Sequence, residues 1–279
     1  MNFTPSKYQQ AILDYFIKNP QSNILVNALA GSGKSSTACM LTEHSTTSDI
    51  YIAFNTSVVE EFKKKIKNPK TKVMTMHSLG YSIMTYNIEQ KNKEKENGKG
   101  TKPTGFGTKF FAQVATLDNR KPHKILDEEI TQRYGRHIEF AKRTFLKESY
   151  VNLYGLCRAT LTNMASSDDV SRLIKDHNIF TYYGEENYQA PNINEITSTL
   201  KILETKSNQL FETQGIIDFG DMLWITYKKL KKGEWEVPYW ALYTNIYCDE
   251  CQDFSNLQLH FLKFIKRAKG RYVFIGDFF

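Results

Sequence analysis

The feature that most constrains this chain is a short glycine-containing segment, Ala28–Ser35, with the sequence ALAGSGKS. It follows an apolar run at Asn23–Asn27 that is typical of a buried strand, and a helical pattern begins at Lys34. In such a strand–loop–helix unit, glycines let backbone N–H groups turn inward around phosphates at the helix N-terminus. Lys34 then reaches the β and γ phosphates, and the Ser35 hydroxyl can bind Mg²⁺. The segment predicts a P-loop, although Ala28 stands where the generic pattern has glycine.

The surrounding pattern predicts an α/β fold. Short apolar runs alternate with helical patterns over the first 88 residues, as in a parallel sheet covered by helices. The same alternation of apolar runs and helical patterns resumes near Ile216. The strands expected after the first are Ile50–Phe54, Val73–Met76, Asn245–Cys248 and Tyr272–Ile275, and the helices are Pro5–Ile17, Lys34–His44, Val58–Lys67, Gly220–Leu230 and Leu257–Lys266.

Between these regions the composition changes. Residues 89–105 contain almost no apolar side chains and carry charges of both signs, which predicts a flexible charged linker. Residues 106–214 are helical in pattern, with amphipathic stretches at Ile138–Met164, Asp168–His177 and Asn194–Thr213. We therefore expect residues 1–88 and 215–279 to form one domain and residues 89–214 to form an inserted helical subdomain.

A second chemical signal is Ile246–Asp253, an apolar run that ends in the adjacent carboxylates Asp249 and Glu250. At the carboxyl end of a strand in an open α/β sheet, such groups face the ligand crevice. Asp249 is then a candidate ligand for a Mg²⁺ that bridges the phosphates, and Glu250 a candidate general base for the attacking water. Taken alone the pair fits a solvated loop equally well, but together with the P-loop it favours nucleotide hydrolysis.

Composition narrows the class of protein only moderately. The 37 lysines and arginines exceed the 30 acidic residues, giving a net charge of +7, which suits a polyanionic partner without identifying one. No apolar run approaches the roughly 18 residues of a membrane span, so we expect a cytoplasmic protein. Cys248 and Cys251 form a Cys-x-x-Cys with no second pair to complete a zinc site.

Asp249–Asp253, with the sequence DECQD, resembles the Asp-Glu-x-Gln-Asp box of UvrD/Rep-like superfamily 1 DNA helicases. Other boxes of that family occur in the expected order. They are Pro5–Ile12, Ala53–Ser57, Thr75–Gly80, Ile217–Leu223 and Val273–Asp277. The resemblance covers the whole chain and implies a RecA-like ATP-binding domain with an inserted helical subdomain.

The resemblance also implies roles for individual residues. It assigns adenine recognition to Gln9, catalysis to Lys34, Asp249 and Glu250, and coupling between ATP and DNA to Gln252 and Asp253. Seen in isolation, Phe54 reads more naturally as a core residue and His77 as a structural histidine. The implied ATP-binding set is Gln9, Ala30, Gly31, Ser32, Gly33, Lys34, Ser35, Ser36 and Asp277; the metal ligands are Ser35 and Asp249; and the single-stranded DNA contacts are Phe54, Asn55, Thr75 and His77.

The implied activity is that of an ATP-dependent DNA helicase with 3′ to 5′ polarity that uses ATP and Mg²⁺. Its implied partners are single-stranded DNA, duplex–single-strand junctions, and a second RecA-like domain in the same or another chain. The implied setting is the nucleoid of a bacterial or phage-infected cell, with the pathway open between replication, repair and recombination. Because the chain ends at Phe279, before the glutamine of the family's Gly-Asp-x-x-Gln box, we expect these residues alone to be poorly active.

Other interpretations stay open at this stage. The chain fits a split or remnant helicase that binds ATP and DNA with a partner, the motor part of a helicase-nuclease, or, less well, a P-loop kinase or switch that ignores nucleic acid. Within the insertion, basic residues either line duplex DNA or belong to a solvated face of mixed charge. The residues concerned are Arg133, Arg136, Lys142 and Arg143.

Overall fold

The computed structural model describes residues 4–29, 31–96, 115–181 and 190–278. The chain divides into two compact units, Met1–Ile83 with Lys229–Phe279, and Met84–Lys228. The domain boundaries predicted from the sequence, at residues 88/89 and 214/215, remain predictions. No helix within the described ranges is long and apolar enough to span a bilayer.

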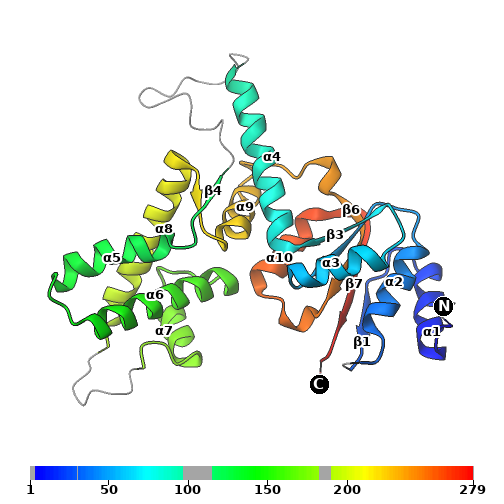
Figure 1. Cartoon of the computed structure of the whole chain (residues 1–279), viewed down its shortest axis with the longest axis horizontal. Helices are drawn as coiled ribbons and strands as arrows, with labels where there is room; N and C mark the ends of the chain where they lie inside the picture. The colour runs from blue at the N-terminus through cyan, green and yellow to red at the C-terminus, as the bar shows by residue number, and fades with distance from the viewer. Residues whose placement is uncertain (1–3, 30, 97–114, 182–189, 279) are drawn as a thin grey trace. The chain divides into compact units, whose positions relative to one another are not determined.

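The first unit is built on a parallel sheet. In the described residues, its strands are ordered β1-β7-β6-β2-β3, and each neighbouring pair is parallel. Figure 1 shows that strands from the end of the chain lie among strands from its beginning. The carboxyl ends of early and late strands therefore meet at one edge. The bounds are β1 Ile24–Asn27, β2 Asp49–Ala53, β3 Thr71–Thr75, β6 Tyr243–Asp249 and β7 Lys266–Gly276.

Helices of the first unit begin at polar capping residues. Ser6 and Gln9 form a capping box at the start of α1, Ser255 and Gln258 form another at α10, and Asn55 caps α3. Buried apolar residues of α1, α2, α3 and the sheet form one core cluster. The helices are α1 Lys7–Lys18, α2 Lys34–Glu43, α3 Thr56–Lys65 and α10 Asn256–Ile265, with short 3₁₀ turns η2 Tyr239–Ala241 and η3 Cys251–Asp253. Two further helices, α4 Met76–Glu96 and α9 Asp221–Lys231, contribute residues to both units.

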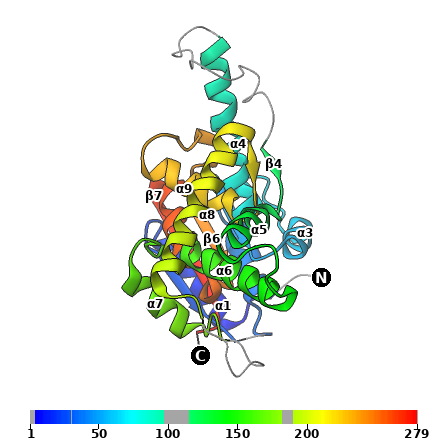
Figure 2. The ribbon, with the colours of Figure 1, turned by 90° about the vertical axis from the view of Figure 1, so that its left-hand side faces the viewer.

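The second unit is mainly helical. Its helices α5–α8, which Figure 2 shows grouped together, pack on one another around a separate apolar core. Two short parallel strands, β4 Thr116–Leu117 and β5 Ile216–Ile217, bring the two ends of this region together. The helices are α5 Lys121–Tyr134, α6 Phe140–Thr160, α7 Ser167–Asp176 and α8 Ile193–Gln214.

The predicted α/β class, with a parallel sheet and a helical region inserted into it, is confirmed. The expected linker differs in its first part, because α4 continues as a helix to Glu96; the remainder, residues 97–105, lies outside the described residues. Strand β7 is longer than predicted. Its first residue, Lys266, already pairs with Tyr243, before an irregularity in the register. Residues Lys266–Gly270 are mostly polar, so a prediction based on runs of apolar residues did not include this part of the strand.

Candidate nucleotide-binding site

The P-loop connects β1 to α2, and its glycines adopt conformations that other residues rarely take. Gly31 has a φ of +77° and Gly33, the N-cap of α2, a φ of +91°. The Ser32 hydroxyl donates a hydrogen bond to the carbonyl of Leu29 at 2.7 Å. The loop is therefore held in a closed turn at the start of a helix, the arrangement that binds phosphate through backbone N–H groups. Ala30, also predicted to bind ATP, lies outside the described residues.

Gln9 reaches this loop from α1. Its Nε2 donates to Thr37 Oγ1 at 3.2 Å, and a Cβ added at Gly33 would lie 3.1 Å from the same nitrogen. Gln10 instead donates to Asp14 on its own helix, at 2.8 Å. The structure thus brings Gln9, and not Gln10, against the P-loop.

Lys34 and Glu250 join the P-loop to the end of β6. Lys34 Nζ lies 3.0 Å from Glu250 Oε2, and the Gln252 amide donates to the same oxygen at 2.8 Å. Gln252 Oε1 in turn accepts from the backbone N–H of Asp277, at 3.3 Å. Three boxes that are far apart in the sequence therefore meet in one hydrogen-bonded chain.

Glu250 is held under strain and kept ionised. It has a φ of +47°, in the left-handed region, which costs a non-glycine residue on the order of 1 kcal/mol. The amide of Gln252 and the ammonium of Lys34 lower the pKa of its carboxyl. Its side chain keeps 38% of its surface exposed, against 11% for Lys34, so this carboxylate is accessible as well as charged. An accessible, ionised carboxylate beside the P-loop lysine suits the role of general base.

Asp249 lies deeper than Glu250. Its Oδ2 accepts a hydrogen bond of 2.6 Å from the buried hydroxyl of Tyr51, and its Oδ1 accepts from the backbone N–H of Glu250 at 3.1 Å. Burial raises the pKa of this carboxyl, and the hydrogen bond from Tyr51 works in the opposite direction. The contact with Tyr51 was not predicted, because Tyr51 reads from the sequence only as one member of a buried strand.

The residues present fit a Mg²⁺ ion that arrives with a nucleotide. Asp249 supplies a carboxylate with lone pairs left free by its two donors, and Ser35 supplies a half-buried hydroxyl in the first turn of α2. Mg²⁺ prefers such oxygen ligands and is usually held by one or two carboxylates together with substrate phosphates. Ser36, the next predicted ATP-binding residue, is exposed in the same turn.

The two cysteines that flank this motif are poor candidates for a metal site. Cys248 is fully buried, and burial raises the pKa of its thiol far above its ordinary value. Burial also raises the pKa of Cys251, to about 11. Metal binding requires the thiolate form, which burial disfavours at both cysteines.

The residues predicted to contact DNA lie at the carboxyl ends of β2 and β3, where Ala53 and Thr75 are register partners. Phe54 is 59% exposed and therefore does not belong to the core. Asn55 Oδ1 accepts from the N–H of Val58 at 2.9 Å, and Thr75 Oγ1 accepts from the N–H of Ser78 at 3.1 Å, so both also cap the turns that follow. His77 lies half-buried in the first turn of α4, while Asp253 is exposed in η3.

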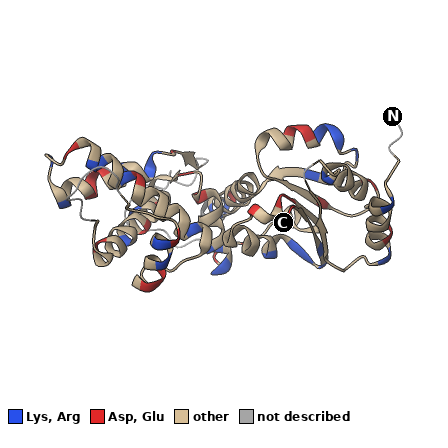
Figure 3. Ribbon diagram, turned by 90° about the horizontal axis from the view of Figure 1, so that it is seen from below, with Lys and Arg blue, Asp and Glu red and all other residues tan. Residues whose placement is uncertain are grey.

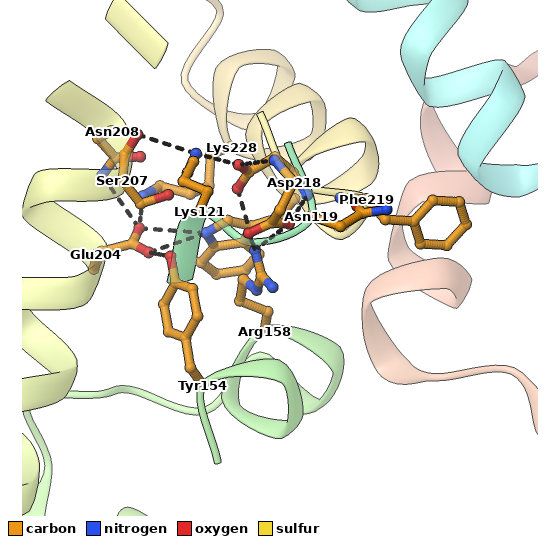
Figure 4. Close-up of polar contacts among 12 residues, drawn as sticks. Asn119, Lys121, Tyr154, Arg158, Glu204, Ser207, Asn208, Asp218, Phe219 and Lys228 are labelled. Carbon is orange, nitrogen blue, oxygen red and sulfur yellow. Dashed lines mark hydrogen bonds and ion pairs between the residues drawn. The ribbon is translucent and has the colours of Figure 1, made fainter. Parts of the chain in front are cut away.

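A second charged cluster lies in the mainly helical unit, around the Asp-Phe-Gly-Asp element (Figure 4). Arg158 donates to both oxygens of Asp218, at 3.0 and 3.1 Å, and to Asp221 at 3.1 Å. The two aspartates also accept each other's backbone N–H bonds at 2.9 Å. A Cβ at Gly220 would lie 2.7 Å from Arg158 Nη2, so this glycine leaves room for the guanidinium.

Lys121 closes the cluster from α5. It pairs with Asp221 and donates to the carbonyls of Ser207 and Ile216, both at 3.2 Å. The sequence marked the Asp-Phe-Gly-Asp element but gave no sign of Lys121 or Arg158. These buried contacts join α5 and α6 to the Asp-Phe-Gly-Asp element, which is therefore explained as structural. Figure 4 shows Phe219 pointing away from them.

Two of the four basic residues named above for the insertion lie beside acidic side chains. Arg133 lies 2.9 Å from Glu129, and Arg143 lies 3.3 Å from Asp127. Figure 3 shows basic and acidic residues interspersed along the helices of this unit. These contacts favour a solvated face of mixed charge over a surface that lines duplex DNA.

Comparison with known families agrees with these boxes. The sequence profile described as the UvrD/REP helicase N-terminal domain matches residues 9–278, which is nearly the whole chain. No curated protein matches the chain.

Proposed function

The chain belongs to the family of UvrD/REP helicase N-terminal domains, and from this we propose that it is the ATP-binding motor domain of a DNA helicase or translocase. The observation that carries the proposal is the hydrogen-bonded chain from Lys34 through Glu250 and Gln252 to Asp277. It joins a phosphate-binding loop to a general base and to the last box of the family's first motor domain.

The site's own residues suggest a sequence of events. Gln9, which bonds to Thr37 beside the P-loop, would recognise the adenine, and the N–H groups of the P-loop would receive the phosphates. Lys34 leaves Glu250 for the β and γ phosphates, since both compete for the same ammonium. Glu250, released from that ion pair, orients and deprotonates the attacking water. Ser35 and Asp249 would hold a Mg²⁺ ion that arrives with the nucleotide, and that ion would supply positive charge to the phosphates.

DNA is proposed to bind at the adjacent sheet edge. The exposed ring of Phe54 can stack on a base, and the exposed Asn55 and half-buried His77 offer polar groups to the phosphate backbone. Thr75 is buried, and its contact with DNA is proposed on family resemblance. Gln252 contacts both the base Glu250 and the backbone of Asp277, so it is suited to transmit nucleotide state between them. We propose 3′ to 5′ movement on family resemblance, with junctions as the physiological substrate.

The complete motor is proposed to include a second RecA-like domain, in the same or a partner chain. In related motors that domain supplies arginines that stabilise the transferring phosphoryl group, and such arginines contribute on the order of 10³ to 10⁵ in rate. We therefore expect the 279 residues alone to bind nucleotide and DNA with slow turnover.

The test is to measure ATP hydrolysis and nucleotide binding by this chain with and without single-stranded DNA, together with its affinity for that DNA at increasing salt, with Lys34→Ala as the control. We expect nucleotide binding that Lys34→Ala abolishes, and single-stranded DNA binding that weakens as salt increases. A chain that binds nucleotide but shows no salt-dependent affinity for DNA would favour a P-loop kinase or switch. Fast, DNA-stimulated turnover that depends on Lys34 would show that a second domain is not needed.

A further inference from the structure

We propose that Tyr51 is a positioning residue for the metal site: its hydroxyl fixes the carboxylate of Asp249 in the orientation that binds nucleotide-associated Mg²⁺. This inference rests on the proposed ATP-dependent function and concerns the same site. It assigns a role to a residue that belongs to none of the nucleotide-binding motifs.

Tyr51 is held rigidly. It lies in β2 with no exposed surface, and its ring stacks on Phe62 of α3 with centroids 4.1 Å apart and planes 19° apart. From this fixed ring the hydroxyl donates to Asp249 Oδ2 at 2.6 Å. Because the ring cannot turn freely, the hydrogen bond also restricts rotation of the carboxylate that accepts it.

Asp249 needs such a constraint because it has few other partners. In the described part of the chain, its hydrogen bonds come from Tyr51 and from the backbone N–H of Glu250, one to each oxygen. A carboxylate can accept about four hydrogen bonds, so lone pairs remain on both oxygens. Those lone pairs are what a metal ion would use.

A second tyrosine–aspartate pair in the same sheet shows the contrasting, structural case. Tyr247 of β6 is the register partner of Tyr51, is equally buried, and donates to Asp49 at 3.3 Å. Asp49 also accepts from Thr47 at 2.7 Å and from the Asn245 side chain at 3.0 and 3.1 Å. Its carboxylate is already saturated by protein donors, so Tyr247 adds one bond among several and positions nothing for a ligand.

The two tyrosines therefore form a matched experiment. Tyr51→Phe and Tyr247→Phe each delete one buried hydroxyl bonded to an aspartate and leave the ring in place. The experiment titrates Mg²⁺ into the full chain with a fluorescent ATP analogue and measures the Mg²⁺ concentration at half-maximal nucleotide binding. Binding of the analogue in EDTA and the melting temperature are measured on the same samples.

We expect Tyr51→Phe to raise the half-saturating Mg²⁺ concentration about tenfold, the lower end of what removing a partner of a metal ligand costs. Metal-free nucleotide binding should be unchanged, because the hydroxyl that is removed donates to Asp249 and the ring that stays stacks on Phe62, both outside the P-loop. Tyr247→Phe should lower the melting temperature and leave the Mg²⁺ dependence at the wild-type value.

An unchanged Mg²⁺ dependence in Tyr51→Phe, or an equal shift in both variants, would overturn the positioning role. Failure of the proposed function gives a different result. In that case wild-type protein would bind the analogue neither tightly nor in a Mg²⁺-dependent manner, and Lys34→Ala would change nothing.

Discussion

The two charged clusters of this protein, around Glu250 and around Asp221, are both built on a lysine–carboxylate ion pair but differ in exposure. At the candidate nucleotide site, Lys34 lies beside Glu250, and these side chains keep 11% and 38% of their surface exposed. In the helical unit, Lys121 meets Asp221, and the corresponding values are 0% and 1%. Each pair joins a lysine to a carboxylate that is far away in the sequence.

The clusters differ in how fully their members are bonded. Asp221 accepts from Lys121, from Arg158 and from the backbone of Asp218, so its oxygens have no need of a ligand. Glu250 accepts from two flexible side chains, Lys34 and Gln252, on a single oxygen, and its backbone is strained. A saturated buried cluster stabilises a fold, whereas a strained and accessible pair is available for chemistry.

The largest expected effect is the loss of hydrolysis in Glu250→Gln. The amide keeps the shape of the side chain but cannot take a proton, so turnover should fall about 10²- to 10⁴-fold in the assembled motor. Nucleotide binding should persist, because Lys34 remains and is released from its ion pair. Steady-state ATPase assays and equilibrium binding on the same preparation check this. Equal loss of binding and turnover would mean that Glu250 is structural, like Asp221.

The second effect concerns stability rather than turnover. Arg158→Met leaves Asp218 and Asp221 buried without their guanidinium, and breaking a buried pair in this way costs about 3 to 5 kcal/mol. The measurement is the free energy of unfolding in urea. Arg172→Met is the control, because Arg172 pairs with Asp169 on the surface, and its loss should change stability by less than about 0.5 kcal/mol. A similar loss of unfolding free energy in the two variants would mean that the Arg158 cluster stabilises the fold no more than a surface ion pair does.

The contrast also explains what could be predicted from the sequence. The P-loop, Asp249 and Glu250 are contiguous motifs that follow apolar runs, and parallel strand order brings their ends together. Arg158 and Lys121 act on partners 60 and 100 residues away, and neither stands in a local pattern that distinguishes it from a surface charge. A local sequence pattern does not show which distant charged residues will become buried partners.

Tyr51 shows the same limit within the nucleotide site. It occupies a strand position where any bulky apolar residue would satisfy the pattern, and its hydroxyl becomes informative only when β6 is placed beside β2. The charged run after Glu89 predicted a flexible linker, but its first part is helical. Its lysines and glutamates are good helix formers, and α4 continues through them to Glu96.

The smallest expected effect is a shift in the titration of Glu250. Gln252 and Lys34 lower the pKa of this carboxyl in the folded protein. A carboxyl with a lowered folded-state pKa contributes stability above its unfolded-state value, near 4.3, and that contribution is lost as the pH falls through the folded-state pKa. Lys34→Ala should therefore raise the pKa of Glu250 toward its ordinary value, as measured by carbon-13 NMR of the carboxyl group.

Lys206→Ala provides the control, since Lys206 pairs with Glu128 in the other unit and should leave the titration of Glu250 unchanged. The titration is a better readout than the free energy of unfolding, because solvent screens an ion pair whose carboxylate is 38% exposed. If Glu250 titrates identically with and without Lys34, the pair does not persist in solution. Glu250 would then be unpaired before nucleotide binds. The proposal that the incoming phosphates release Glu250 from Lys34 would have to be abandoned.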